Sequence, residues 1–112
     1  DLEQMNRLFF NLIKNSLESI QEKSKKDSKI DKNIDIEIRQ RRDYININII
    51  DTGVGFKNKT TKELIKPYFT TKEKGTGLGL SIVDKIISDH NGSIQFLNHK
   101  KGAKIQIILP NK

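Results

Sequence analysis

The sequence predicts an α/β fold, a two-layer sandwich in which one mixed, mostly antiparallel sheet is covered by about three helices. Two observations predict this class. Segments with apolar residues at three- and four-residue spacing precede and separate segments in which apolar and polar residues alternate. Elements in this order bury one face of a sheet under helices. The chain has 112 residues, enough for one core, so residues 1–112 are interpreted as one domain.

The first predicted element is a long helix over residues 2–23. Its apolar side chains recur at helical spacing: Met5, Leu8, Phe9, Leu12, Leu17 and Ile20. Phe10 and Ile13 widen this stripe, so we expect the helix to be buried over much of its girth. Asn11 and Asn15 interrupt the apolar surface on one helix face. They are either satisfied structural amides or ligands, because an Asn oxygen suits a hard cation such as Mg²⁺.

A polar surface connector is predicted over residues 21–33. Residues 34–39, which alternate strictly, and residues 44–51 follow it, with turn-like residues between them. This pattern predicts an antiparallel hairpin with one buried face.

The second strand of that hairpin ends in an aspartate. Period two places Asp51 on the inward side with Ile47 and Ile49. A carboxylate in that position needs a partner, and the glycines that follow, Gly53 and Gly55, permit close approach of the backbone. Asp51 therefore either caps the turn or accepts a hydrogen bond from the exocyclic amine of a base such as adenine.

Three glycines, Gly75, Gly77 and Gly79, stand at alternate positions directly before an apolar helical pattern. This is either ordinary loop chemistry or a phosphate-binding loop, because the first amides of a helix have no intrahelical partners and attract anions. A short helix is expected around residues 61–66. The segment Pro67–Lys72 between it and the glycines suits a lid over a ligand.

A last helix is predicted over residues 79–90, with Gly92 as its C-terminal stop. Strands over residues 93–97 and 103–109 complete the sheet. The inward side chains expected from these elements are Leu80, Val83, Ile86, Ile87, Ile94, Phe96, Ala103, Ile105, Ile107 and Leu109.

The composition restricts the function classes. The net charge is +7, but five lysines fall in the predicted connector, so a solvated basic loop explains the charge better than a nucleic-acid site. Without cysteine there are no disulfides or thiolate metal sites, and no stretch resembles a signal peptide or a membrane span. His90 and His99 fall at a helix end and in a hairpin turn, and both are interpreted as structural.

Four of these segments together resemble the ATP-binding catalytic domain of sensor histidine kinases, within the wider family of gyrase- and MutL-type ATPases. In order and spacing they are similar to its N box, first glycine box, F box and second glycine box, at residues 11–16, 51–56, 67–72 and 75–80. The short lid and the end of the N box look most similar to nitrogen-regulation kinases. The resemblance implies ATP as ligand and Mg²⁺ as cofactor.

The resemblance also implies residue roles. Asn15 would hold Mg²⁺, Asn11 would support the metal and phosphate site, and Asp51 would bind the adenine amine. Together with Lys72, the two asparagines form the expected catalytic group. The other expected nucleotide contacts are Gly53, Gly55, Phe69, Thr70, Thr71, Lys72, Gly75, Thr76, Gly77, Leu78, Gly79 and Leu80.

This chain departs from the resemblance in two respects. Many histidine kinases carry Lys or Arg one turn after the metal-binding Asn, whereas this chain has Glu18 and Ser19. Phosphate contacts are therefore expected from Lys72, Lys74 or Lys14. The phosphoacceptor histidine and its helical dimerisation domain have no counterpart here, so we expect a fragment that begins just before the N box.

The resemblance implies partners for such a fragment. They are its own dimerisation and histidine-phosphotransfer domain and the receiver domain of a response regulator. The fragment is expected to be a monomer and the full-length protein a homodimer. The domain is expected in the cytoplasm, and the parent is either soluble or anchored in the bacterial inner membrane.

Two rival functions stay open beside the kinase. Gyrase-type ATPases place a general-base Glu one turn before the metal-binding Asn, and here that position is Asn11, which cannot act as a base. This favours a transferase over an ATPase. The other alternative is a degenerate module that binds nucleotide or docks a partner without transferring phosphate.

Overall fold

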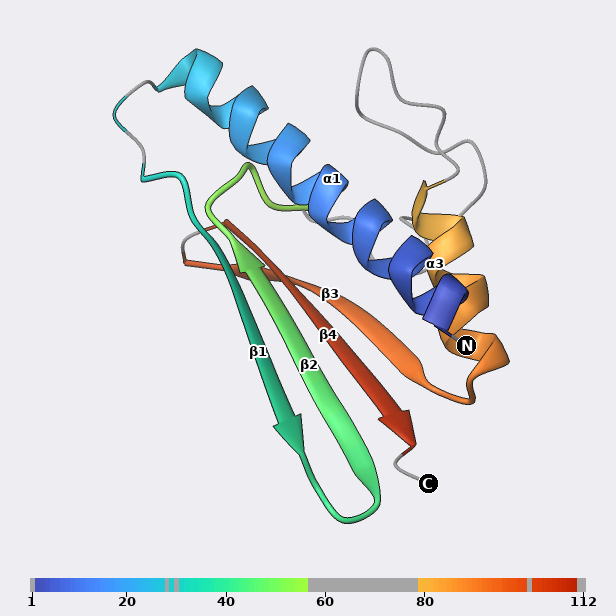
Figure 1. Ribbon diagram of the computed structural model, residues 1–112. Coiled ribbons are helices and arrows are strands. Elements are labelled where there is room, and N and C mark those ends of the chain that lie inside the picture. The colour runs from blue at the N-terminus through green and yellow to red at the C-terminus, as the bar shows by residue number, and fades with distance from the viewer. Residues whose placement is uncertain (1, 28, 30, 57–78, 101, 111–112) are drawn as a thin grey trace.

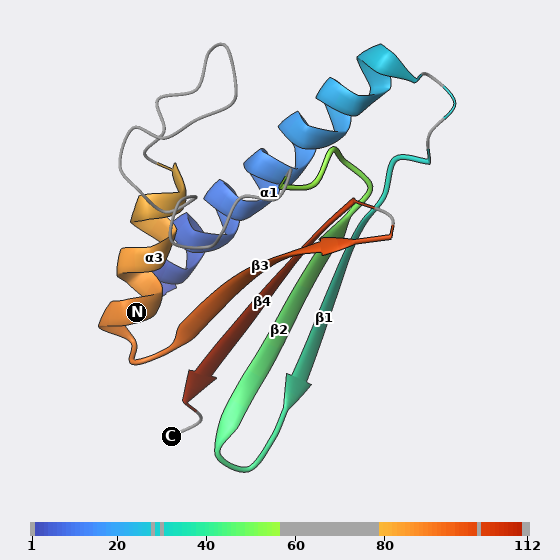
Figure 2. The same ribbon diagram turned by 180° about the vertical axis from the view of Figure 1, so that it is seen from behind.

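The computed structural model describes residues 2–27, 29, 31–56, 79–100 and 102–110 of the chain. Within them, two helices lie on one face of a four-stranded sheet, as Figure 1 and the reverse view in Figure 2 show. The elements in chain order are α1 (Leu2–Lys26), β1 (Ile34–Gln40), β2 (Tyr44–Asp51), α3 (Gly79–Asp89), β3 (Ser93–His99) and β4 (Gly102–Pro110).

The strand order is β1-β2-β4-β3, and each neighbouring pair is antiparallel. This confirms the predicted two-layer α/β sandwich with a mostly antiparallel sheet. β3 is therefore not adjacent to β2, and β4 lies between them. The short helix predicted around residues 61–66 lies outside the described residues.

One core joins the helices to the sheet. It consists of Leu8, Leu12, Ile47, Ile49, Val83, Ile86, Ile87, Ile94, Phe96, Ile105 and Ile107. Every strand residue in this set was predicted to face inward, because an alternating strand buries one side only. Leu80 and Leu109 are partly buried against the same core.

Two features of α1 differ from the prediction. Phe10 and Leu17 are exposed, so the helix is not buried over much of its girth. In a two-layer fold α1 contacts the sheet and α3 with one side, and the described residues place nothing on its opposite side. The helix also continues to Lys26, into the segment predicted as a connector.

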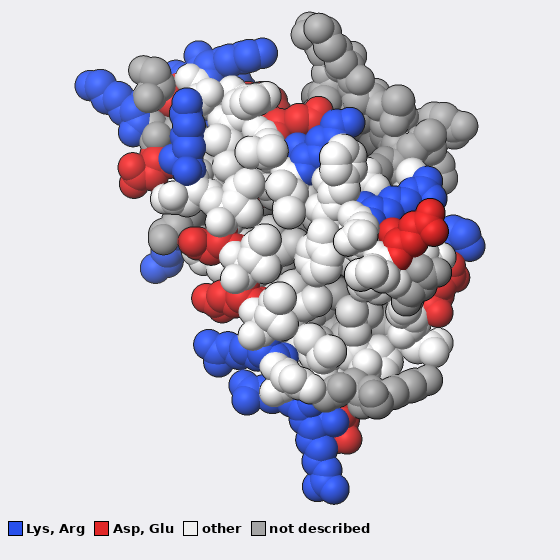
Figure 3. Space-filling model, in the orientation of Figure 1, with Lys and Arg blue, Asp and Glu red and all other residues white. Residues whose placement is uncertain are grey.

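The C-terminal turn of α1 carries much of the basic charge that was assigned to a loop. Lys23, Lys25 and Lys26 lie in that last turn, where cations interact favourably with the helix dipole. Figure 3 shows blue side chains near this end of α1, near the turn between β1 and β2, and also on the right of this face, with red side chains among them. The basic residues are thus spread over this face and do not form one patch.

The hairpin of β1 and β2 is buried less evenly than predicted. Ile36 and Ile38 pair with Ile49 and Ile47 and so lie on the helix-covered side of the sheet. Nevertheless Ile38 is 64% exposed, whereas Ile47 is 5% exposed. The reason is position: β1 is the edge strand, and α1 crosses the sheet near the other end of the hairpin (Figure 1).

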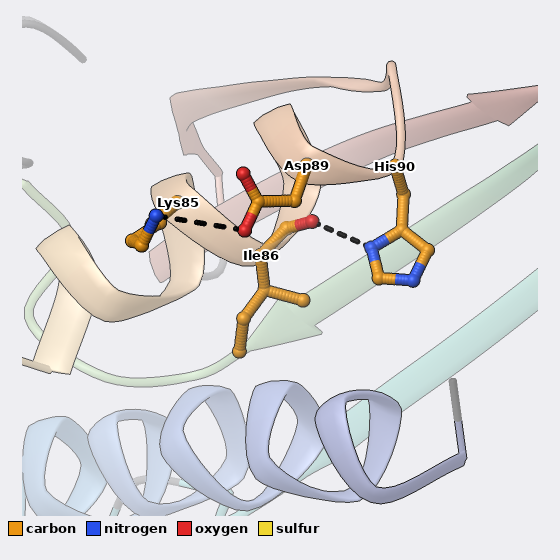
Figure 4. Close-up of polar contacts among 4 residues, drawn as sticks. All are labelled: Lys85, Ile86, Asp89 and His90. Carbon is orange, nitrogen blue, oxygen red and sulfur yellow. Dashed lines mark hydrogen bonds and ion pairs between the residues drawn. The ribbon is translucent and has the colours of Figure 1, made fainter.

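The end of α3 is closed by its own backbone and by a histidine. Nδ1–H of His90 donates to the Ile86 carbonyl at 2.7 Å, and Lys85 pairs with Asp89 at 3.6 Å (Figure 4). The residue in the left-handed region is Asn91, with φ of 60°.

Gly92 is needed at this position for another reason. Its N–H bonds to the Ile87 carbonyl and completes the helix cap. A Cβ there would lie 2.6 Å from the Ile108 carbonyl oxygen, because the chain passes directly against β4. Asn91 supplies the turn, and Gly92 supplies the close approach.

None of the described helices is long and apolar enough to cross a membrane.

Candidate functional site

Asp51 is the buried charge around which the candidate site is built. It ends β2 on the helix-covered side, opposite Ala103 of β4, and is 3% exposed. Its Oδ1 accepts a hydrogen bond from the Gly53 N–H at 2.8 Å. This contact satisfies one oxygen of the carboxylate and fixes its orientation.

Burial and hydrogen bonding act on this carboxyl group in opposite directions. Burial raises the pKa of Asp51 because it penalises the charged form. The Gly53 N–H, the Ser16 hydroxyl, the Ala103 N–H and the charge of Lys23 each lower that pKa. Burial is the largest effect, so the pKa lies above the ordinary value for aspartate.

The polar face of α1 leads directly to the turn after Asp51. Asn11, Asn15 and Ser19 follow at four-residue intervals and so form one line along the helix. Ser19 Oγ, at the end of this line, accepts a hydrogen bond from the Val54 N–H at 2.9 Å. The structure therefore brings the predicted N box and the first glycine box together at one end of the sheet.

Gly53 is packed against α1 too closely for any side chain. A Cβ there would lie 2.1 Å from Ser19 Oγ and 2.8 Å from the Ser19 backbone carbon. The close approach predicted for this glycine is therefore toward the helix.

The next turn is held by the hairpin of β3 and β4. Gly55 adopts φ of 77°, which favours glycine. The Phe56 N–H then donates to Asn98 Oδ1 at 2.9 Å, and the Phe56 ring meets the Phe96 ring edge-on with centroids 5.4 Å apart. The segment after Asp51 is thus fixed on both sides, by α1 and by this hairpin.

Two further contacts hold the end of β2: one with Gly102 of β4, and one with Asn33, which precedes β1. Gly102 adopts φ of 156° where a Cβ would lie 2.5 Å from the Asp51 carbonyl oxygen. On the other side, Asn33 and Thr52 exchange backbone and hydroxyl hydrogen bonds, with the Asn33 N–H donating to Thr52 Oγ1 at 3.0 Å. Asp51 is therefore presented by a rigid frame.

The donor groups on α1 fit a magnesium–phosphate ligand. Asn11 is half-buried, and its Nδ2 donates to the Arg7 carbonyl at 2.9 Å. This bond uses the amide nitrogen, so the oxygen is the atom that remains for a ligand. Amide oxygens suit Mg²⁺, which usually binds few protein groups and completes its shell with water and phosphate. The described residues contain no cluster of three or more acidic, His or Cys side chains that could hold a metal ion.

The described residues include part of the predicted site. Asn11 and Asn15 lie on α1, and Asp51, Gly53 and Gly55 lie at the end of β2 and in the turn that Ser19 of α1 contacts. Gly79 and Leu80 open α3 as predicted. The remaining predicted contacts, Phe69, Thr70, Thr71, Lys72, Gly75, Thr76, Gly77 and Leu78, lie outside the described residues, as do the alternative phosphate ligand Lys74 and the lid.

Sequence reasoning missed several residues that build this frame. Ser16, Asn98 and Gly102 received no role, and Ser19 was noted only as a departure. Ser16 gave a usable signal, because a hydroxyl between Leu12 and Ile20 interrupts the apolar stripe of α1. The contact between Asn98 and Phe56 joins positions 42 residues apart and gave no local signal.

The fold and the candidate site together have the arrangement of an ATP-binding α/β sandwich. A family profile described as "Histidine kinase-, DNA gyrase B-, and HSP90-like ATPase" matches residues 1–112. The chain belongs to this family, as the resemblance predicted.

Individual relatives agree with the family. Sporulation kinase A of Bacillus subtilis is 35% identical over 113 residues, which cover 100% of this chain and 17% of the relative. A putative sensor histidine kinase, NtrY-like, of Rickettsia felis is 36% identical over 108 residues, covering 96% of this chain and 17% of the relative. The predicted similarity to nitrogen-regulation kinases is therefore confirmed, and sporulation kinases share it. The chain spans about a sixth of the length of these relatives.

A solved structure shows the same fold. The catalytic domain of histidine kinase ThkA superposes with a TM-score of 0.80 at 28% identity, covering 98% of this chain and 69% of that one.

Proposed function

We propose that this chain is the catalytic module of a two-component sensor histidine kinase. It binds ATP with Mg²⁺ and presents the γ-phosphate to a histidine on a separate dimerisation domain, for later relay to the receiver domain of a response regulator. The observation that carries this proposal is the Ser19–Val54 hydrogen bond, which joins the turn after Asp51 to the face of α1 that bears Asn11 and Asn15. The family match supports the same ligand class.

The proposed base site uses hydrogen-bond complementarity. Asp51 Oδ1 is engaged by Gly53, so Oδ2 is the oxygen available to the 6-amino group of adenine. An ionised carboxylate is an acceptor only, and an amine is a donor, so the pair fits when Asp51 is charged. Because Asp51 is buried, an unsuitable base leaves it without a partner, which disfavours binding.

The proposed phosphate site combines α1, the start of α3 and the glycine segment. Asn15 would hold Mg²⁺ and Asn11 would support it, while Gly75–Leu80 and Lys72 would surround the phosphates. Bound Mg²⁺ would neutralise phosphate charge, which is its usual contribution to phosphoryl transfer. The chain's own contribution is positioning and exclusion of water.

Asn11 favours transfer over hydrolysis. Hydrolysis needs a group that activates water, and an amide cannot take a proton at neutral pH. The Nδ2 group of Asn11 also donates to the Arg7 carbonyl, and this bond holds the Asn11 side chain against the helix.

The experiment is calorimetric titration of the chain with a non-hydrolysable ATP analogue, with and without Mg²⁺. We expect binding that depends on Mg²⁺ and is lost in Asp51→Asn. Phosphoryl transfer is then tested in the full-length protein, with Asn15→Asp as the metal-site variant. Binding without transfer in the full-length protein would favour the degenerate module, and absence of binding by a folded chain would contradict the proposed function.

A further inference from the structure

Ser16 occupies a position where an apolar side chain is the ordinary choice. It lies on α1 between the core-facing Leu12 and Ile20, one turn from each, and is 2% exposed. Its Oγ is fully buried and has no partner at hydrogen-bond geometry among the described residues. A buried hydroxyl without a partner costs free energy, so this hydroxyl needs an explanation.

The charged group beside that hydroxyl is Asp51. Ser16 and Asp51 are both buried where α1 contacts the turn after β2, and the Ser16 hydroxyl lowers the pKa of the Asp51 carboxyl group, although the oxygen atoms are not at hydrogen-bond geometry. The other groups that act on this carboxyl are Lys23 of α1 and the backbone N–H groups of Gly53 and Ala103. Ser16 is the one neutral side-chain donor in this set.

We propose that Ser16 is a positioning residue for Asp51 in nucleotide recognition. Its O–H donates to the Asp51 carboxylate when the nucleotide is bound, and so keeps that carboxylate ionised and oriented toward the 6-amino group of the base. This inference rests on the proposed function of Asp51. The hydroxyl acts through Asp51 and does not contact the nucleotide.

The Asp51 carboxylate can accept more hydrogen bonds than the one that Gly53 donates to Oδ1, so it has room for both Ser16 and the base. A carboxylate accepts about four hydrogen bonds, and the amine of adenine uses one of them. The Ser16 donor favours the ionised form of the carboxylate and fixes its orientation toward the base. Removal of this donor should therefore weaken the bond to the amine.

The test combines two protein variants with two nucleotides. ADP and the matching purine riboside 5′-diphosphate, which lacks the 6-amino group, are titrated into wild type and Ser16→Ala. We expect Ser16→Ala to weaken ADP binding about tenfold, the value of one hydrogen bond to a charged group, and to change binding of the amine-free nucleotide little. An equal loss for both nucleotides would overturn the proposal.

Stability distinguishes positioning from a structural role. Ala has the higher helix propensity and brings no unpaired hydroxyl, so we expect Ser16→Ala to melt at or above the wild-type temperature. A variant that lost stability and ADP affinity together would show that Ser16 is structural. Ser16→Cys, which retains a weak donor of similar size, should bind ADP with an affinity between those of wild type and Ser16→Ala; an affinity at or below that of Ser16→Ala contradicts the proposal.

The pH profile gives a third readout. ADP affinity should fall as Asp51 becomes protonated, and in Ser16→Ala this fall should begin at higher pH because a donor that favours the charged form is missing. An unchanged profile contradicts the proposal. Ser24→Ala is the matched control, since Ser24 Oγ bonds only the Gln21 carbonyl at 2.9 Å. If Asp51→Asn lowers the affinity for the two nucleotides equally, the proposed function of Asp51 fails instead.

Discussion

At the scale of single residues, burial of the charged Asp51 carboxylate lowers the stability of the folded state. Its pKa is raised by burial, so the folded state binds the proton more tightly than the unfolded state does. The folded state therefore loses stability as pH rises from about 4, the unfolded pKa, through the raised folded pKa. Above that raised pKa the whole cost of the buried charge is present.

Asp51→Asn should therefore separate stability from binding. We expect the variant to melt at or above the wild-type temperature at pH 7, and the decline in stability with rising pH to shrink. ADP affinity should fall at least about tenfold, because the charged acceptor is lost. Thermal unfolding between pH 4 and 8, with calorimetric titration, checks both; a variant less stable than wild type at pH 7 would argue against the assigned burial cost.

Gly53 gives a second residue-scale prediction. Gly53→Ala should destabilise the chain by about 1–3 kcal/mol, as overpacked sites do, because its Cβ would meet Ser19. The double variant with Ser19→Ala should not recover, since the Ser19 Cβ and backbone carbon would still lie 2.6 and 2.8 Å from the new Cβ. Denaturant unfolding of the two single variants and the double variant measures this; full recovery would mean that only the hydroxyl is in the way.

At the scale of elements, the hairpin of β1 and β2 offers two isoleucines that are cross-strand neighbours but differ in burial. Ile47→Ala should cost about 2–5 kcal/mol, as buried large-to-small substitutions do, because Ile47 is in the core. Ile38→Ala should cost well under half as much, since Ile38 is largely exposed at the edge strand. Denaturant unfolding measures both losses in the free energy of unfolding. Equal losses would show that Ile38 is buried as well as Ile47 is.

The cap of α3 provides another element-scale prediction. Asn91→Gly should be close to neutral, and Asn91→Val should destabilise by about 1–2 kcal/mol, because left-handed backbone is unfavourable for residues with a Cβ and most of all for branched ones. Gly92→Ala should also destabilise, through contact with the Ile108 carbonyl. Thermal melts of the three variants rank these effects, and a tolerated valine would contradict the assigned turn.

At the scale of the whole molecule, nucleotide binding should stabilise the fold, because the proposed site joins α1, β2 and the β3–β4 hairpin. At a nucleotide concentration of 100 Kd the gain is about 2.7 kcal/mol, which for a domain of this size raises the melting temperature by about 10 °C. Chelation of Mg²⁺ should reduce the shift, and Asp51→Asn should abolish it. A shift retained in that variant would place the nucleotide elsewhere.

Much of the molecule followed from local pattern alone. The four described strands, their inward residues and both described helices were predicted, because burial on one face imposes a period of two or 3.6 on the sequence. The four motifs, by their order, predicted the family and placed Asn11, Asn15 and Asp51 as candidate ligands.

The tertiary structure decided what depends on neighbours distant in sequence. Exposure of Ile36 and Ile38 depends on how far α1 covers the sheet, and exposure of Phe10 and Leu17 depends on what packs against the far side of α1; periodicity contains neither. The hydrogen bonds from Val54 to Ser19 and from Phe56 to Asn98 join residues that are 35 and 42 positions apart in the sequence. The sequence by itself determined the family and which residues are candidates for the site; only packing determined how Asp51 is held and what its buried charge costs, because desolvation and hydrogen bonding act through space.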